Sequence, residues 1–244
     1  MPVAHLIARL KRRLGRSLSV TEAYRFWAPR YDVDEPNIMM RLGDELLRRA
    51  LEDLDLGGKD VLDIGCGTGR NWRFIESHRP RRLVGVDISA PMLARLKKKH
   101  PSAELLQGDG ADPRALTRAD FDVLLSTLAL GYMPDARSVL HAWRRVLRPD
   151  ARLVVVTLHP EALDAGVRRT CSHRGQTFDI RHFHHPREQV EAALTSSGFV
   201  DVHTDTVRVD ERVRDLYAAQ NSLHVYESIR GTPMVIAYKG RLPG

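Results

Sequence analysis

The residues with the clearest chemical potential form a glycine-rich turn between Val61 and Arg70, which reads VLDIGCGTGR. Its three glycines allow the backbone to turn sharply and to approach a ligand without interference from Cβ atoms. The spacing is G-x-G-x-G, and Arg70 stands where a dinucleotide-binding fingerprint has Gly or Ala. The preceding strand also ends in the carboxylate of Asp63, which would repel a pyrophosphate. The turn therefore favours a ligand with a cationic head.

Two further acids are expected at the ends of the next two strands. Asp87 lies 18 residues beyond Gly69 in the stretch GVDIS, and Asp109 lies in the turn QGDG. An acid at the tip of the neighbouring strand can accept hydrogen bonds from both hydroxyls of a ribose. Three carboxylates on consecutive strands, beside a glycine loop, therefore predict one binding site at the carboxyl edge of a parallel sheet.

With these motifs in order, the sequence resembles the class I S-adenosylmethionine-dependent methyltransferases. The motifs that carry the resemblance are DIGCGTG, GVDIS, QGDG, FDVLLSTLALGYMPD and WRRVLRPDARLVVV. The stretch from Tyr24 to Asp32 is similar to the N-terminal lid of small-molecule methyltransferases, so the likeness covers about residues 24 to 158. The chain departs from the family at Asp150-Ala151, where relatives carry two glycines. Such motifs are specific for cofactor and fold but not for substrate.

The resemblance implies that S-adenosylmethionine is the cofactor and assigns it a set of residues. Tyr31 would cover the carboxylate; Asp63, Gly65, Cys66, Gly67, Gly69 and Ser126 would surround the methionine part; Asp87 would bind the ribose; and Ile88, Met92, Asp109 and Gly110 would surround the adenine. The sulfonium is already electrophilic, so the protein need only align a nucleophile and remove a proton where necessary.

His159 is the residue we expect to act as the catalytic base. It directly follows the fifth predicted strand, at the edge where open α/β sheets bind ligands. A strand through Ile180 to His184 would also place His182 and His184 on one face. Substrate contact, proton transfer, metal ligation and an ordinary loop role all stay open for these two histidines. No metal site is predicted, because the segment lacks a carboxylate-rich or Cys-x-x-Cys pattern.

Charge and composition make nucleic-acid binding and membrane insertion less expected functions of this chain. Of the net charge of +7 over 244 residues, five basic residues and no acid fall in residues 1 to 16, which leaves the rest nearly neutral. Nucleic-acid binding is therefore not expected except through this basic segment. The fourth strand ends in Ser126-Thr-Leu-Ala129 rather than the Asn-Pro-Pro-Tyr of relatives that methylate bases. Two distant cysteines and the lack of a long apolar run predict a cytoplasmic protein without stable membrane insertion.

Hydrophobic patterning predicts alternating strands and helices that would position these residues. We expect strands at 60–64, 82–86, 103–107, 121–126, 152–158, 199–209 and 234–238, and helices at 3–14, 19–27, 37–54, 69–77, 91–98, 136–147 and 186–197. Ser19 and Glu22 form a capping box for the second helix. The predicted fold is α/β, a Rossmann-like, doubly wound seven-stranded sheet that is mostly parallel, with an antiparallel C-terminal strand.

The sequence thus predicts two parts and one activity. Residues 1–18 would be a basic amphipathic segment, and residues 19–244 a single methyltransferase domain with a lid from 19–36 and 159–185. The expected reaction is methyl transfer from S-adenosylmethionine to an oxygen or nitrogen of a small molecule. The alternatives are an RNA acceptor, a carrier-protein-bound acyl acceptor, and a non-catalytic S-adenosylmethionine-binding protein. The sequence does not predict an oligomeric state.

Overall fold

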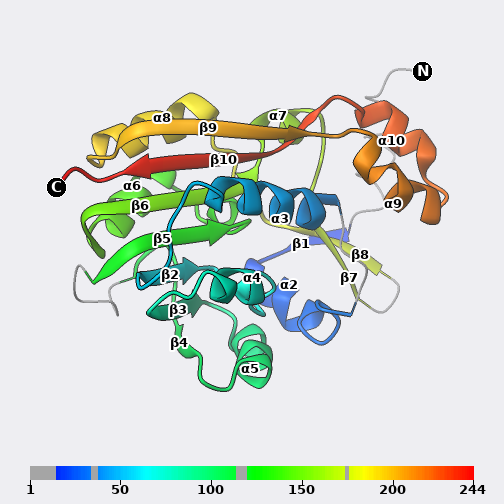
Figure 1. Ribbon diagram of the computed structural model, residues 1–244. Helices are drawn as coiled ribbons and strands as arrows, with labels where there is room; N and C mark the ends of the chain where they lie inside the picture. Colours follow the sequence, from blue (N-terminus) through cyan, green and yellow to red (C-terminus); the bar gives the residue numbers. More distant parts are fainter. Residues whose placement is uncertain (1–14, 34–37, 114–119, 174–175) are drawn as a thin grey trace.

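A seven-stranded sheet with helices on both faces forms the centre of the molecule, as the computed structural model shows (Figure 1). The structure describes residues 15–33, 38–113, 120–173 and 176–244; the helix predicted at 3–14 lies outside them. The strand order is β4-β3-β2-β5-β6-β10-β9, and β10 is antiparallel to both of its neighbours. The strands are β2 Asp60–Ile64, β3 Arg82–Asp87, β4 Glu104–Gln107, β5 Phe121–Thr127, β6 Leu147–Leu158, β9 Val200–Arg208 and β10 Pro233–Arg241. The predicted fold class is confirmed.

Successive residues of the central strands pack on opposite faces of the sheet. Val61 belongs to one hydrophobic cluster and Leu62 to the other, and Val154 and Val155 divide in the same way. One face is covered by α3 Ile38–Leu51, α4 Trp72–Ser77 and α5 Ala90–Lys99, and the other by α6 Ala136–Arg144 and α8 Arg187–Ser196. Because both faces are buried, these strands read as continuous apolar runs rather than as alternating ones.

A second, three-stranded sheet lies beside α2 Val20–Trp27, the helix that begins with the predicted Ser19–Glu22 capping box. Its order is β1-β8-β7, with β1 Gly15–Leu18, β7 Thr170–His173 and β8 Gln176–Ile180. Gly15–Leu18, assigned from sequence to the N-terminal segment, thus joins the folded body. The two segments expected to form a lid pack on one another, because α2 contacts both β7 and β8. That they form a lid over the cofactor stays a prediction.

Three regions differ from the sequence-based expectation. The predicted strand through His184 is wrong: β8 ends at Ile180, and the chain then runs along the 3₁₀ turn Leu130–Tyr132, where Phe183 N donates to Gly131 O. Helices α9 Arg214–Ala219 and α10 Leu223–Ile229, preceded by the 3₁₀ turn Glu211–Val213, were not predicted. Neither was α7, Pro160–Asp164, which starts immediately after His159.

Candidate active site

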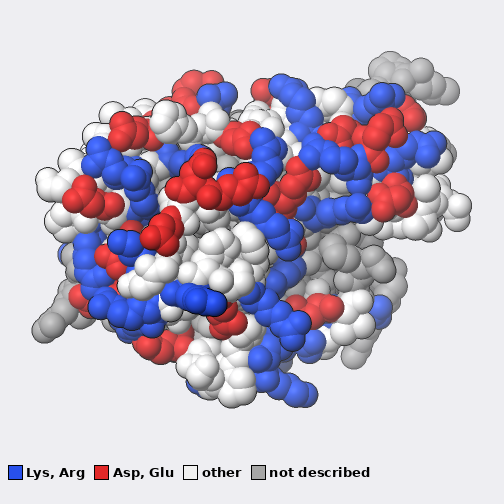
Figure 2. Space-filling view, in the orientation of Figure 1, with Lys and Arg blue, Asp and Glu red and all other residues white. Residues whose placement is uncertain are grey.

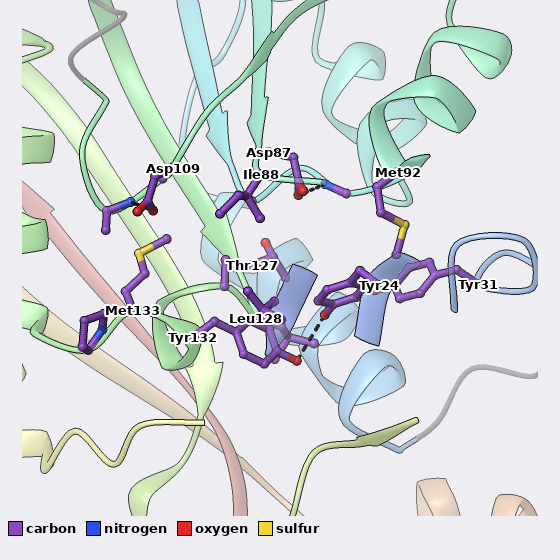
Figure 3. Close-up of a pocket in the computed structure, with 17 residues that line it drawn as sticks. Tyr24, Tyr31, Asp87, Ile88, Met92, Asp109, Thr127, Leu128, Tyr132 and Met133 are labelled. Atoms are coloured by element: carbon purple, nitrogen blue, oxygen red, sulfur yellow. Dashed lines mark hydrogen bonds between the residues drawn. The ribbon is translucent and has the colours of Figure 1, made fainter. Parts of the chain in front are cut away.

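The main cavity opens at the carboxyl ends of β2, β3, β4 and β5, where the strand order reverses between β2 and β5 (Figure 3). Open α/β sheets bind ligands at such a switch point. The lining from the ends of β3 and β4 and the residues after them includes Asp87, Ile88, Met92, Asp109, Gly110 and Ala111. The lining from α2 and from the segment after β5 includes Val20, Tyr24, Leu128, Tyr132, Met133 and Pro134, and Tyr31 lies beside Met92 (Figure 3). A second cavity adjoins it and shares Tyr31, Gly65, Gly67 and Thr127.

The three glycines of the turn have left-handed backbone conformations but different surroundings. Gly67, at φ +53°, lines both cavities, and a Cβ added there would meet no atom within 4 Å. A Cβ on Gly65 would lie 2.3 Å from the Cβ of Ala129, and one on Gly69 would lie 2.8 Å from Cγ of Leu96. Gly67 thus leaves open space for a ligand. Gly65 and Gly69 instead allow close packing of the loop on its neighbours.

Asp63 is a buried carboxylate at the end of β2, and it lines the second cavity. Its Oδ2 accepts a hydrogen bond of 2.9 Å from the indole N–H of Trp72. Burial raises the pKa of Asp63 to about 7, and the nearby Asp87 adds to the rise. A carboxylate in such surroundings is stabilised by a cation, as the sequence interpretation requires.

Asp87 and Asp109 lie on the β3 and β4 side of the main cavity. Both oxygens of Asp87 accept backbone hydrogen bonds of 2.8 Å, from Gly67 N and from Ser89 N. Burial raises the pKa of Asp87 as well. Asp109 is exposed, and its Oδ1 accepts from Ala111 N. Each Asp87 oxygen keeps a lone pair for a further donor, so a ribose diol can be bound there.

The other residues assigned to the cofactor lie around the cavities, with two differences. Ile88, Met92, Gly110 and Tyr31 line the main cavity, and Cys66 lines the second. Ser126 is completely buried and does not line either cavity; its neighbour Thr127 lines both. Gly69 also lies outside both linings, against α4 and α5. Neighbouring residues of a strand point to opposite faces, so Thr127 can line the cavities while Ser126 points away from them.

The structure does not place His159, the expected catalytic base, in the wall of either described cavity. The residue is 4% exposed, does not line either described cavity, and caps α7, because its Nδ1 accepts from Glu161 N at 3.2 Å. Burial lowers its pKa. A ring nitrogen that caps a helix cannot at the same time accept a proton from a substrate. Its assignment as catalytic base stays a prediction without support from this geometry.

Two residues in and behind the cavity wall, Tyr132 and Arg169, had weak sequence signals. Tyr24 and Tyr132 face one another, and the Tyr24 hydroxyl donates to that of Tyr132 at 3.1 Å (Figure 3). Behind them Arg169, 3% exposed, donates from Nε to the Tyr132 hydroxyl at 2.8 Å. Tyr132 lies inside the motif that follows β5, whereas Arg169 stands in an irregular stretch where no pattern marks it.

The described residues contain neither a metal-binding cluster nor a membrane-spanning helix. Among them, no group of three or more His, Cys, Asp or Glu side chains is placed to hold a metal ion. His184 instead lies 3.2 Å from Asp164, and His185 bonds the carbonyl of Met133. Within the same described ranges, no helix has the length and apolar character required to cross a bilayer.

In sequence, the chain is similar to known methyltransferases. Residues 62–155 match the family model described as a methyltransferase domain. The chain is 30% identical over 178 residues to a malonyl-[acyl-carrier protein] O-methyltransferase of Halorhodospira halophila, an alignment that covers 71% of this chain and 59% of the relative. It is 38% identical over 115 residues to the demethylmenaquinone methyltransferase of Lactococcus lactis, covering 43% and 45%.

Solved structures share the fold. An S-adenosylmethionine-dependent methyltransferase from Mesorhizobium loti superposes with a TM-score of 0.61 at 22% identity, over 82% of this chain and 97% of that one. The [4+2]-cyclase SpnF superposes with a TM-score of 0.63 at 17% identity, over 92% and 96%. The chain spans about half to three fifths of the length of the first curated relatives it matches. Residues 62–155 thus match a methyltransferase domain, and the chain has the Rossmann-like fold of S-adenosylmethionine-dependent methyltransferases.

Proposed function

We propose that the protein binds S-adenosylmethionine across its two adjoining cavities and transfers the methyl group to an oxygen or nitrogen of a small molecule. The observation that carries this proposal is the pairing of two carboxylates with an open glycine turn: the buried Asp63 beside the second cavity, the half-buried Asp87 beside the main one, and Gly67 between them. The ammonium group suits Asp63 and the ribose suits Asp87. The adenine would lie between Ile88 and Met92, near Asp109.

The residues fit this cofactor on grounds independent of the family resemblance. Within the described part of the chain, the Asp63 carboxylate accepts a side-chain hydrogen bond from Trp72 alone, so a donor with positive charge would complete its surroundings. The space at Gly67 is where a Cβ would obstruct a ligand. When bound, the sulfonium supplies an electrophilic methyl group, and the chain's own residues supply alignment and exclusion of water.

The relatives leave two alternatives for the acceptor and one for the activity. The match to a malonyl-[acyl-carrier protein] O-methyltransferase favours a carrier-bound acyl group as the second candidate acceptor. RNA is a weaker alternative, because basic and acidic side chains are interspersed on the face shown in Figure 2. The likeness to a cyclase shows that this fold also supports other chemistry, so a chain that binds the cofactor without transferring its methyl group is the contrasting case.

Calorimetry tests cofactor binding first. We expect S-adenosylmethionine and S-adenosylhomocysteine to bind, and NAD to show no measurable binding, because Asp63 faces the site where a pyrophosphate would lie. Affinity for NAD comparable to that for S-adenosylhomocysteine would refute the assignment. Methyl transfer from labelled cofactor over metabolite, carrier-protein and RNA pools then identifies the acceptor. Tight cofactor binding with no transfer to any pool would favour the non-catalytic alternative.

A further inference from the structure

A positive charge lies buried behind the wall of the main cavity, with no acidic partner among the described residues. Arg169 forms no ion pair with any acid in the described part of the chain, and the hydroxyls of Tyr132, Tyr24 and Tyr31 raise its pKa. Its Nη1 lies 3.8 Å from the Met39 sulfur, and its Nη2 has no hydrogen-bond partner. Arginine stays charged in proteins, and buried charges are normally paired. The described residues therefore provide no acid to pair with Arg169.

Tyr132 lines the cavity and accepts a hydrogen bond from Arg169, which connects the buried charge to the cavity wall. The guanidinium carbon lies 6.0 Å from the Tyr132 ring centre and 5.8 Å from that of Trp27. The Tyr132 hydroxyl accepts from both Arg169 Nε and the Tyr24 hydroxyl, so its own hydrogen is available to donate. A hydroxyl that accepts from a cation donates a stronger hydrogen bond. This side of the cavity therefore presents a polarised donor with a positive charge behind it, which favours an anion.

This wall offers no evident base for a neutral acceptor. Among the described lining residues, the carboxylates are Asp87 and Asp109, both at or just after the ends of β3 and β4. His182 packs its ring on that of Tyr132 at 5.5 Å but does not line the cavity, and burial lowers its pKa to about 4. An acceptor that is already ionised at neutral pH needs no base. The rest of this wall is apolar, with Val20, Leu128, Met133 and Pro134.

The geometry points to a carboxylic acid with an apolar body as the methyl acceptor, bound in front of Tyr24 and Tyr132 with Arg169 behind them. This inference rests on the proposed function and adds the substrate class. One carboxylate oxygen is held by the Tyr132 hydroxyl, and a lone pair of the other forms the bond to the methyl carbon. The carbon–sulfur bond breaks, and its electron pair stays on sulfur. The carboxylate and sulfonium charges cancel, no proton is released, and the products are a methyl ester and S-adenosylhomocysteine.

Matched acid and amide pairs test the inference on the complete chain. Octanoic, decanoic and cinnamic acids and their primary amides are titrated into the protein saturated with S-adenosylhomocysteine. We expect at least one acid to bind at least tenfold more tightly than its amide, and that acid to be methylated with S-adenosylmethionine. Failure of every acid to bind, or equal affinity for acids and amides, would overturn the inference. Binding of S-adenosylhomocysteine is measured before any acid is added, so failure of the proposed function is seen separately.

Two neighbouring arginines provide a matched comparison. Arg169→Gln should abolish the preference for acid over amide while S-adenosylhomocysteine affinity stays within threefold. Arg168→Gln removes the same charge from an exposed side chain that bonds only backbone carbonyls in the described structure, and should keep the preference. If Arg169→Gln does not fold, Tyr132→Phe removes the donor and should reduce the preference at least fivefold. Loss of S-adenosylhomocysteine binding in a folded Arg169→Gln protein would place Arg169 in the cofactor site and refute the proposal.

Discussion

Asp63 is the residue whose protonation a bound cation would change most. With a pKa of about 7, its carboxyl is half protonated near neutral pH in the free protein. An ammonium group binds the ionised form, so cofactor binding should lower this pKa and release a proton. We expect S-adenosylhomocysteine affinity to fall as the pH falls from 8 to 5.5, by up to about tenfold per pH unit below 7. Calorimetry in buffers of different ionisation enthalpy measures both the affinity and the number of protons released on binding.

The matched variant for this pH dependence is Asp63→Asn, which keeps the shape of the side chain and an acceptor for Trp72. Its affinity should be lower at pH 8, and the component of the pH dependence near pH 7 should be absent. Asp87 also has a raised pKa, so some dependence at lower pH can persist. An Asp63→Asn variant with the same pH profile as wild type would show that another group binds the ammonium.

Asp87 is proposed to bind the ribose and also holds the loop, so both affinity and stability must be measured when it is replaced. Asp87→Ala should weaken S-adenosylhomocysteine binding by about 1.5–3 kcal/mol, because a charged acceptor for the ribose hydroxyls is lost. It also leaves the N–H groups of Gly67 and Ser89 without their acceptor. The free energy of unfolding is therefore measured in parallel by urea denaturation. Unchanged affinity in a destabilised protein would mean that Asp87 only holds the loop.

For His159 the sequence interpretation and the structure give different roles, a catalytic base and a helix cap. If it were the catalytic base, His159→Ala would lower turnover by about 10²-fold. As the cap of α7, it should instead contribute about 0.5–2 kcal/mol to stability, with turnover retained within threefold. We expect the second result, measured by thermal unfolding and by turnover at saturating cofactor. A folded variant with the large loss of turnover would restore the catalytic assignment.

At the scale of elements, the glycine turn contains an internal comparison. Gly67→Ala places a Cβ in open cavity space, so affinity for S-adenosylhomocysteine should fall at least tenfold, with about 1–2 kcal/mol lost from stability because φ is positive. Gly69→Ala has the same backbone penalty and adds a Cβ 2.8 Å from Leu96 Cγ. It should reduce stability more and affinity less. Urea denaturation and calorimetry on both variants give the two orderings, and reversed orderings would contradict the proposed place of the ligand.

Elements that bury both faces or have clear caps were predictable from sequence, and those defined by contacts across the chain were not. The central strands follow from continuous apolar runs, and α2 from the Ser19 capping box. The small sheet depends on β1 pairing with β8, more than 150 residues later, a contact that no local pattern encodes. The segment after Ile180 was expected to continue as a strand through His184, but Phe183 N donates to Gly131 O instead. The role of Arg169 was not predicted for the same reason, because its partners Tyr132 and Met39 lie far away in the sequence.

At the scale of the whole molecule, the distribution of charge separates the site from the N-terminal segment. The net charge of +7 includes five basic residues within residues 1–16, and the remaining chain is close to neutral. Figure 2 shows acidic and basic side chains interspersed on one face of the molecule. The residues proposed to bind the cofactor all lie after residue 30, so the basic segment and the cavity can be tested independently.

Two N-terminal deletions distinguish charge from structure. Removing residues 1–14 takes away Arg9, Lys11, Arg12 and Arg13 but spares β1, so S-adenosylhomocysteine affinity and stability should stay close to those of the full chain. Binding to a mixed-sequence RNA or to anionic vesicles, where the full chain shows it, should weaken and depend less steeply on salt.

Removing residues 1–18 also deletes β1 and the buried Leu18, which packs with Ala23, Cys171 and Ile180. That deletion should lower the unfolding temperature and disturb the wall that carries Tyr24. Equal stability of the two deletions would show that β1 is dispensable, and undiminished RNA binding after removal of residues 1–14 would assign that binding to the folded body.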